Sequence, residues 1–273
     1  MTRISYFCLL VIQKLRSMVN VFVYDRTFEG LLTVVFDAYS KKIFPNIIVS
    51  KGDSLPLFYE HLIHCRTDRE RPERVWKALE KKLSHGALSQ LVMCWISEER
   101  GVDMLLFRYI CKVFDTCQPI ETNFADEDVL GVFRLSKKIS QERGHILQFL
   151  RFQRTKDDVY FAAIEPLYNV LPFTVDFLKD RFGGQQWLVY DSKRRYGFFY
   201  DMKEVREVYF TSEDARLLSG WLSDDLLAAD ELLFQQMWRT YFKATTIRER
   251  INPKQQRRMM PVRFWGNLPE KRK

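Results

Sequence analysis

The chain has 273 residues, enough for one large domain or two ordinary ones, and 47% of them are hydrophobic and 15% aromatic. This composition is ample for a buried core and excludes a chain too polar to fold. The formal net charge of +8 and the pI of about 9.2 favour an anionic partner without identifying it.

The positive charge is regional. Residues 239–273 contain eleven basic and two acidic residues, a net charge of +9, whereas the other 238 residues sum to about −1. A concentrated basic segment is typical of an electrostatic binding surface, and a solvated C-terminal face is the alternative.

The N-terminus contains a short apolar run, Ile4–Ile12, behind Arg3. It resembles a weak signal peptide, but no small-residue cleavage site follows and the run is too short to span a bilayer. We therefore expect no membrane association. Met18 stands directly before a strand pattern, so we interpret residues 1–17 as a non-native extension, or otherwise as a short leading helix. The sequence leaves the start at Met1 or Met18 open.

The first half is expected to be mainly helical. β-Branched and aromatic residues predict a strand over 19–25, and a second strand is expected over 61–68, with a loop from Phe44 to Pro56 between them. Apolar residues at helical spacing predict helices over 27–42, 67–84, about 86–96 and about 102–114.

The second half begins with a predicted helix over 126–143, ending near Gly144. Strand-like runs follow, joined by short polar turns that are typical of an antiparallel sheet; they span 145–154, 158–166, 185–191, 195–201 and 205–210. A helix over 173–184 interrupts them, and a long amphipathic helix is predicted over 223–245. The fold class is therefore α+β: a helical N-terminal half, a central antiparallel sheet and a helical basic C-terminus. We divide the chain into 18–118 and 119–273, or one integrated domain, 18–273.

The five cysteines are irregularly spaced and lie mostly in apolar runs, so we interpret them as buried thiols in a reducing, cytoplasmic compartment. They form no CxxC or CxxxCxxC pattern, and the four histidines form no HExxH pattern. The sequence therefore predicts neither a metal site nor a bound cofactor.

The stretch INPKQQRRMMPVRFWGNLPE, residues 251–270, combines cations with large apolar side chains. Asn252 can cap a short helix with Pro253 at its first position. We expect Met259 and Met260 to face the body of the protein and the aromatic residues after Arg263 to clamp the segment there. The predicted phosphate contacts of this docked arm are Lys254, Arg257, Arg258 and Arg263. An acidic protein partner would use the same residue types.

Two further cationic positions could contribute. Arg151, on a predicted strand, is expected to lie beside aromatic residues on one sheet face. If that face is exposed, Arg151 could form a stacking platform for unpaired bases with six aromatic residues: Tyr160, Trp187, Tyr190, Tyr196, Phe198 and Tyr200. If the face is buried, we expect Arg151 to pair with Glu165 or Asp191. A predicted hairpin turn also presents three cations to phosphate or simply to solvent: Lys193, Arg194 and Arg195.

Three carboxylates lie at the ends of predicted elements and have no evident structural role there, namely Asp25, Glu29 and Glu165. They are the candidates for a metal ligand or a general base, although the chain shows no recognisable catalytic motif.

Four segments, 24–32, 149–172, 181–201 and 251–270, together resemble a bacterial family of DNA metabolism or DNA repair proteins, a domain of unknown function. The resemblance spans most of 19–270. It implies a DNA transaction, because the family's genes often adjoin one for a radical-SAM DNA modification or repair protein, and some relatives are fused to a uracil-DNA-glycosylase-like domain. The family tends to have a histidine at the position of Gly144, so His145 receives no inherited role.

The resemblance and the basic arm favour a DNA metabolism or repair accessory protein that binds DNA non-specifically and works with a radical-SAM partner. One alternative is a metal-dependent nuclease or base-processing enzyme that uses Asp25, Glu29 or Glu165. The other is a protein-interaction subunit that does not touch nucleic acid.

Overall fold

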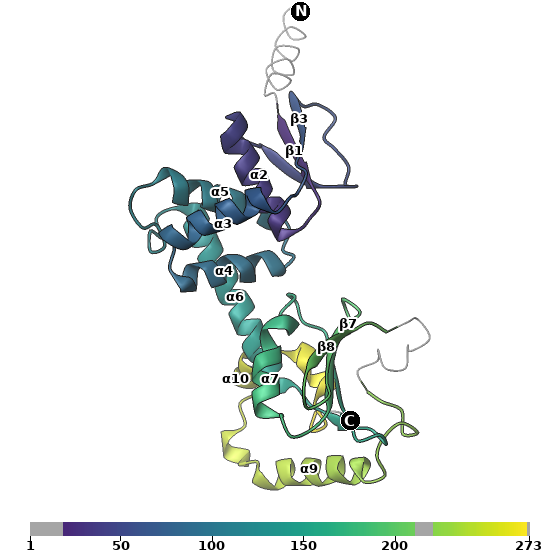
Figure 1. Ribbon diagram of the computed structural model, residues 1–273. Coiled ribbons are helices and arrows are strands. Elements are labelled where there is room, and N and C mark those ends of the chain that lie inside the picture. Colours follow the sequence, from purple (N-terminus) through teal and green to yellow (C-terminus); the bar gives the residue numbers. More distant parts are fainter. Residues whose placement is uncertain (1–18, 211–220, 272–273) are drawn as a thin grey trace, which may run out of the picture. The chain divides into compact units, whose positions relative to one another are not determined.

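A computed structural model describes residues 19–210 and 221–271 (Figure 1). The chain divides into two compact units, Met1–Lys137 and Lys138–Lys273, and the boundary falls inside helix α6 (Glu127–Phe149). The boundary expected from sequence, between 118 and 119, lies earlier, in the connection before α6. The interpretation of residues 1–17 as an extension concerns residues outside the described part of the chain.

The described part of unit 1 combines a small sheet with helices. Its elements before α6 are β1 (Asn20–Tyr24), α2 (Phe28–Lys41), β2 (Ile47–Ser50), β3 (His61–His64), α3 (Glu70–Lys82), α4 (His85–Ile96) and α5 (Val102–Asp115). The strand order is β2-β1-β3 and both pairings are parallel, with Val21 opposite Ile47 and Leu62. The central strand β1 is buried, as its continuous apolar sequence predicts.

Sequence patterns predicted two of these three strands. The strands expected over 19–25 and 61–68 are confirmed as β1 and β3, although β3 is shorter. The loop expected from Phe44 to Pro56 is wrong, because β2 lies within it. Four residues between Asn46 and Lys51 are too few to show a period, and only pairing with β1 defines them as a strand.

A compact turn joins β1 to α2. The Thr27 hydroxyl accepts a hydrogen bond from the Gly30 amide and so caps the helix, while the Thr27 amide and hydroxyl both donate to Asp25 Oδ1, at 3.1 and 2.7 Å. A Cβ on Gly30 would overlap Asp25 Oδ1 and would lie 2.9 Å from the Tyr24 ring. The sequence YDRTFEG therefore needs a glycine at this position.

Unit 2 is built on a five-stranded sheet. Its elements after α6 are β4 (Gln153–Arg154), β5 (Tyr160–Ile164), η1 (Leu171–Thr174), α7 (Val175–Arg181), β6 (Trp187–Asp191), β7 (Tyr196–Tyr200), β8 (Val205–Val208), α9 (Glu231–Thr245), η3 (Arg248–Arg250), α10 (Pro253–Met259) and η4 (Val262–Asn267). The strand order is β4-β5-β6-β7-β8.

The α+β class is confirmed, but this sheet is mixed and not purely antiparallel. β5 and β6 run parallel, with Ala162 opposite Val189, and the other pairs are antiparallel. The helix expected over 173–184 is present as α7 and forms the crossover that parallel neighbours require. Helix α7 therefore connects β5 to β6, whereas the sequence had indicated an interruption between successive strands.

Helix α6 does not end near Gly144, and the strand expected over 145–154 is wrong except for its last two residues. Ile139 and Ile146 are both buried, so the helical period continues past the glycine. A glycine in a helix interior costs only about 1 kcal/mol relative to alanine, which packing offsets. The run of large apolar residues in QFLRF is compatible locally with either a helix or a strand.

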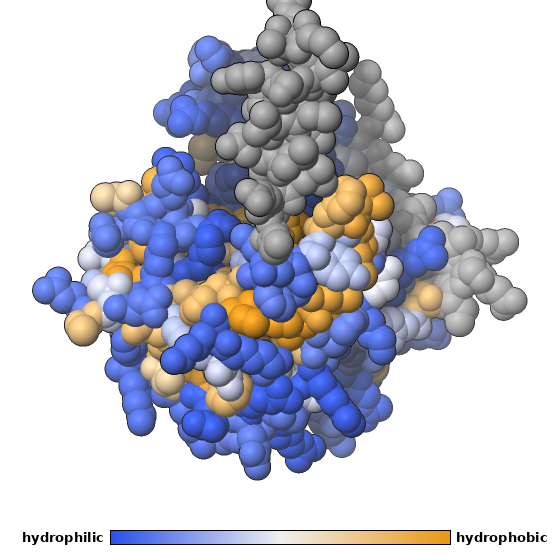
Figure 2. Space-filling view, turned by 90° about the horizontal axis from the view of Figure 1, so that it is seen from above, coloured by the Kyte–Doolittle hydropathy of each residue, from blue (hydrophilic) through white to orange (hydrophobic). Residues whose placement is uncertain are grey.

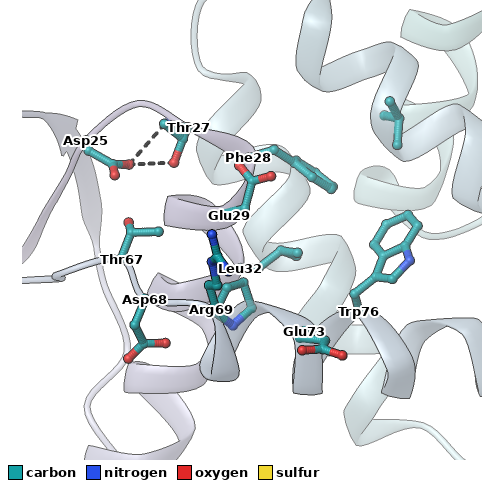
Figure 3. A pocket seen from close by; sticks show the side chains of 12 residues that line it. Asp25, Thr27, Phe28, Glu29, Leu32, Thr67, Asp68, Arg69, Glu73 and Trp76 are labelled. Atoms are coloured by element: carbon teal, nitrogen blue, oxygen red, sulfur yellow. Dashed lines mark hydrogen bonds between the residues drawn. The ribbon is translucent and has the colours of Figure 1, made fainter.

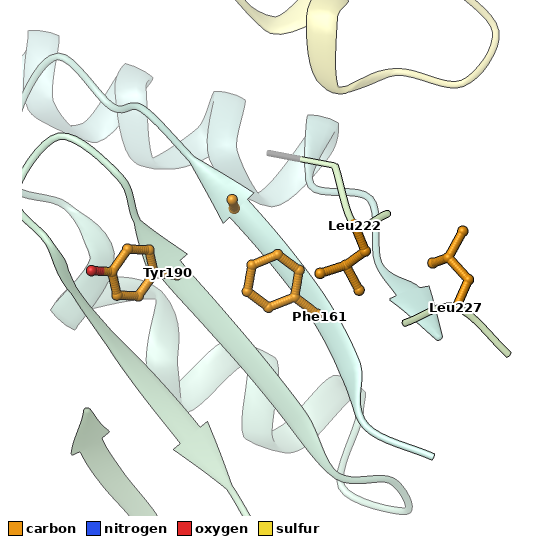
Figure 4. Close-up of a cluster of buried hydrophobic side chains, with 5 residues drawn as sticks. Phe161, Tyr190, Leu222 and Leu227 are labelled. Atoms are coloured by element: carbon orange, nitrogen blue, oxygen red, sulfur yellow. The ribbon is translucent and has the colours of Figure 1, made fainter. Parts of the chain in front are cut away.

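The long helix expected over 223–245 begins later, at Glu231. Part of the segment before it completes a core cluster on the sheet, where Leu222 and Leu227 pack with Phe161, Ala163 and Tyr190 (Figure 4). The Leu222 amide also donates to the buried side chain of Gln153, at 3.0 Å. Packing against the sheet therefore overrides the helical pattern there.

None of the helices in the described ranges combines the length and the apolar character needed to cross a membrane.

Replacement of Gly30 by alanine is expected to destabilise the protein by about 1–3 kcal/mol, because the new methyl group overlaps Asp25 and Tyr24. Urea denaturation measures the effect. The matched control is Gly144→Ala, since a Cβ there meets nothing within 4 Å in the interior of α6. That variant should gain roughly 0.5–1 kcal/mol. Equal stability of the two variants would contradict the close packing at Gly30.

The cysteines provide a second test. The prediction of buried thiols is confirmed for Cys65, Cys94 and Cys111 and is wrong for Cys117, which is exposed; Cys8 lies outside the described residues. Burial raises the pKa of the Cys65 and Cys94 thiols to about 12 and that of Cys111 to about 11. Because the thiolate is the reactive form, a thiol reagent at pH 8 should modify Cys117 rapidly and these three only after unfolding. Peptide mass mapping identifies each site, and rapid native labelling of Cys94 would be inconsistent with the packing.

Candidate nucleic-acid interface

We extend the name basic arm from residues 251–270 to residues 231–271, which comprise α9, η3, α10 and η4. The predicted start of α10 is confirmed: the Asn252 side chain accepts a hydrogen bond from the Gln255 amide, at 3.0 Å, and Pro253 occupies the first turn. Lys254, Arg257 and Arg258 are spaced three and four residues apart, so they share one face of α10. The sequence alone therefore placed these three cations correctly on a capped helix.

The end of the arm is attached to α6. Phe264 is buried and its ring lies 5.4 Å from Phe149 and 5.7 Å from His145, while Trp265 donates a hydrogen bond to the Met260 carbonyl. The expected aromatic clamp is thus confirmed for Phe264. His145 has a packing role there, stacked on Phe149. The expectation that Met259 faces the body is wrong, since 64% of it is exposed.

Six cations of the basic arm are exposed and make no ion pair or side-chain hydrogen bond with any described residue: Lys243, Arg248, Arg250, Lys254, Arg257 and Arg258. Glu249 supplies the one carboxylate in the sequence from 239 to 269. The first three were part of the regional charge count, but no local pattern distinguished them individually. They are available to an anionic partner.

Arg263 is not one of the outward-facing cations that the sequence predicted. It pairs with Glu142, a carboxylate of α6 whose side chain is 3% exposed, and its guanidinium also lies over the Phe264 ring. The other oxygen of Glu142 accepts the Leu167 amide, at 2.9 Å. A buried carboxylate requires such a partner, so we assign Arg263 a structural role.

Arg151 also has an intramolecular partner, but neither of those expected. Its guanidinium lies 3.4 Å from Glu270 and donates to the carbonyls of Gln148 and Leu150. Most of the aromatic residues of the suggested stacking platform are buried, including Trp187, Tyr190, Tyr196 and Tyr200. The burial alternative is therefore confirmed for these residues, and they offer no stacking surface.

The β6–β7 turn is organised by Asp191, which is fully buried. Its Oδ1 accepts the amides of Lys193 and Arg194, and its Oδ2 accepts the Arg194 guanidinium at 3.0 Å. Arg194 also donates to the carbonyls of Pro166 and Leu167. Lys193 and Arg195 remain exposed at this turn, but Lys193 Nζ also donates to the Leu167 carbonyl, at 3.3 Å, so Arg195 is the one predicted phosphate contact of the three without such a partner among the described residues.

Three of the predicted site residues line one pocket of unit 2. Glu165, Lys193 and Arg263 surround a cavity of about 370 Å³, together with Ser192 and Asn267. The cavity lies at the carboxyl ends of the parallel strands β5 and β6, the edge at which open sheets with parallel strands commonly bind ligands. Sequence could not bring these residues together, because it did not show that the two strands are parallel.

The other two candidate carboxylates belong to unit 1. Asp25 and Glu29 line a pocket of about 820 Å³ beside Phe28 and Trp76 (Figure 3). Partial burial would raise the pKa of Asp25, but the Thr27 hydrogen bonds outweigh it and lower that pKa below its usual value. A general base works best with a pKa near the working pH, so this environment does not suit Asp25 to that role. No three histidine, cysteine or carboxylate side chains gather as a metal site within the described residues.

Helix α9 exposes an apolar face, and the sequence did not indicate that this face is left uncovered. Leu233, Met237 and Tyr241 repeat every four residues and are between 56% and 60% exposed, and Phe234 and Trp238 lie beside them. Figure 2, seen from the side on which β1 and β3 are drawn in Figure 1, also shows hydrophobic residues gathered among hydrophilic ones. An apolar helix face that the described residues leave uncovered is typical of an interaction surface.

Removal of the Arg263 side chain is expected to destabilise the protein. Arg263→Ala leaves the Glu142 carboxylate buried without its cation, which should cost about 2–4 kcal/mol, somewhat below the range for a fully buried pair because a third of the Arg263 side chain is exposed. Urea denaturation measures the loss. The matched control is Arg257→Ala on the same arm, where we expect a change within about 0.5 kcal/mol. Equal effects would show that Arg263 has no structural role.

Residues 100–270 match the model of a family described as a domain of unknown function, DUF4130. No curated protein matches the chain. Among solved structures, a pGpG-specific phosphodiesterase, PggH, from Vibrio cholerae is similar over 83% of this chain and 100% of its own, with 10% identity and a TM-score of 0.29. So low a TM-score supports no inference about fold or activity. The family match covers more than half of the chain, including α5, α6 and almost all of unit 2, and the protein therefore belongs to the DUF4130 family.

Proposed function

We propose that the protein is an accessory factor in DNA metabolism or repair that binds nucleic-acid backbones non-specifically through its basic arm. The observation that carries this proposal is the set of six exposed arm cations without an intramolecular partner among the described residues. Cations that are already solvated lose little when a phosphate replaces water, and the counterions released from the nucleic acid favour binding. Paired cations such as Arg263 would first have to break an existing contact.

The chemistry of the arm fits phosphate better than base recognition. Lysine and arginine side chains on an exposed helix can follow a backbone but carry no sequence information unless they reach base edges. The sheet aromatics that could have stacked on bases are mostly buried. We therefore assign the arm to non-specific binding, with Lys193 and Arg195 as additional candidate phosphate contacts.

The partner that performs the chemistry is part of the same proposal. The resemblance noted for residues 24–32, 149–172, 181–201 and 251–270 implies a radical-SAM DNA modification or repair protein, and a uracil-DNA-glycosylase-like protein in some relatives. The chain shows no recognisable catalytic motif of its own. Its role would then be to hold DNA for the enzyme.

A second candidate function is that of a protein-interaction subunit. The exposed apolar face of α9 favours it, because Met, Trp and Tyr side chains are enriched at protein interfaces and are costly to leave in water. The two functions are compatible if α9 holds the partner enzyme while the cations hold DNA. Co-purification with the radical-SAM protein after nuclease treatment would support this candidate, and loss of the complex in Met237→Asp would locate the contact on α9.

Binding of duplex DNA measured across a salt series should depend on the arm. In a triple variant with Lys254, Arg257 and Arg258 changed to alanine, we expect the slope of log K against log salt to flatten by about 3 units, since each phosphate contact contributes about 0.9. Fluorescence anisotropy with a labelled duplex gives both slopes.

The matched control removes three exposed cations of unit 1 instead: Lys51, Lys81 and Arg100. It has the same net charge as the arm variant, so a purely global charge effect would change both slopes equally. Such equality, or the absence of binding at low salt, would refute the assignment of the arm and leave the protein-interaction function as the better candidate.

A further inference from the structure

The pocket of unit 1 has features that the basic arm does not use. It lies where β1 ends and α2 begins, and the chain after β3 and the first turns of α3 complete it (Figure 3). Its volume of about 820 Å³ falls within the range of small-molecule sites. It also lies at the carboxyl ends of two parallel strands, β1 and β3.

The wall of this pocket is apolar and aromatic. Phe28, Leu32, Pro72, Trp76 and Val92 line it, and the rings of Phe28 and Trp76 meet edge to face with their centroids 5.8 Å apart. In Figure 3, Phe28, Leu32 and Trp76 lie on one side of Glu29, with Asp25 and Asp68 on the other. A flat or aliphatic body would therefore find packing partners from three helices.

The remaining lining residues make the pocket acidic. Four carboxylates and one guanidinium contribute: Asp25, Glu29, Asp68, Glu73 and Arg69. Asp68 is held by Arg71 and Glu73 by Lys77, at 2.7 and 2.6 Å. Glu29 is exposed and makes no ion pair or side-chain hydrogen bond with another described residue. One carboxylate is thus available to a ligand.

This charge distribution discriminates between ligands. A phosphate or carboxylate group would meet several negative charges, and the cap at the start of α2 is already occupied by Thr27. A cation would be attracted by Glu29 and by the faces of the aromatic rings together, since the electron-rich face of Trp or Phe attracts a ligand cation. The aromatic wall and the free carboxylate therefore favour the same class of ligand.

We propose that this pocket binds a small organic cation, an ammonium or amidinium group on an apolar body, with Glu29 as the counter-ion and Phe28 and Trp76 as the packing surface. The site is separate from the proposed nucleic-acid contacts of the basic arm, and it does not depend on them. It lies outside the residues that match the DUF4130 family model, 100–270. The pocket would therefore add a small-molecule function to the family domain.

Three probes of nearly one shape test the proposal on the full chain: benzamidine, benzamide and benzoate, which are cationic, neutral and anionic. By isothermal titration calorimetry we expect benzamidine to bind with a Kd below about 1 mM and at least about tenfold more tightly than benzamide. Benzoate should bind more weakly than benzamide. Equal affinity of the three probes, or no detectable binding of benzamidine, would overturn the assignment.

Two variants locate the binding. Glu29→Gln and Trp76→Leu should each weaken benzamidine binding at least about fivefold. The control is Glu80→Gln, an exposed carboxylate on α3 that does not line the pocket. Thermal unfolding monitored by circular dichroism verifies that each variant is folded. If Trp76→Leu does not fold, Glu29→Gln still tests the proposal, because it preserves the shape of the side chain. Unchanged affinity in folded Glu29→Gln would reject Glu29 as the counter-ion and with it the proposal.

Discussion

The architecture of unit 2 depends on one buried carboxylate. Glu142 on α6 accepts the Leu167 amide from the segment after β5 and pairs with Arg263 near the end of the chain. A buried charge is costly unless its partners are in place, so these three segments must assemble together. One and two turns further along α6, His145 and Phe149 pack on Phe264. This attachment fixes where the basic arm ends and leaves the cations before it outside.

Local signals were sufficient for elements that are determined locally. The Thr27 and Asn252 caps, the central strand β1 and the helix α7 could all be predicted from neighbouring residues. Prediction failed where pairing with distant residues decides the structure: β2 is a strand because it pairs with β1, and β5 and β6 are parallel because α7 crosses over between them. The continuation of α6 through Gly144 has the same origin, since burial of Ile146 compensates for the glycine.

The candidate site shows the same division. A charge count located the basic arm, but it could not separate free cations from those with structural partners. Arg151 and Arg263 are held by carboxylates 119 and 121 residues away in the sequence, which no local pattern indicates. Arg194, in contrast, pairs with Asp191 only three residues earlier, and the turn DSKR already contained that signal. The exposed face of α9 was hidden for a different reason: an amphipathic pattern shows that a stripe exists but not whether anything covers it.

The basic arm carries both the free cations and the apolar face of α9, and this combination has a consequence for the behaviour of the protein in concentrated solution. At low ionic strength, repulsion between arms of like charge keeps copies of the chain apart. Salt shortens the range of this repulsion to about 8 Å near 0.15 M, whereas contact between apolar faces is not weakened by screening. We therefore expect a lower colloidal stability in high salt than in low salt. Its solubility is coupled to the same charges that we assign to nucleic-acid binding.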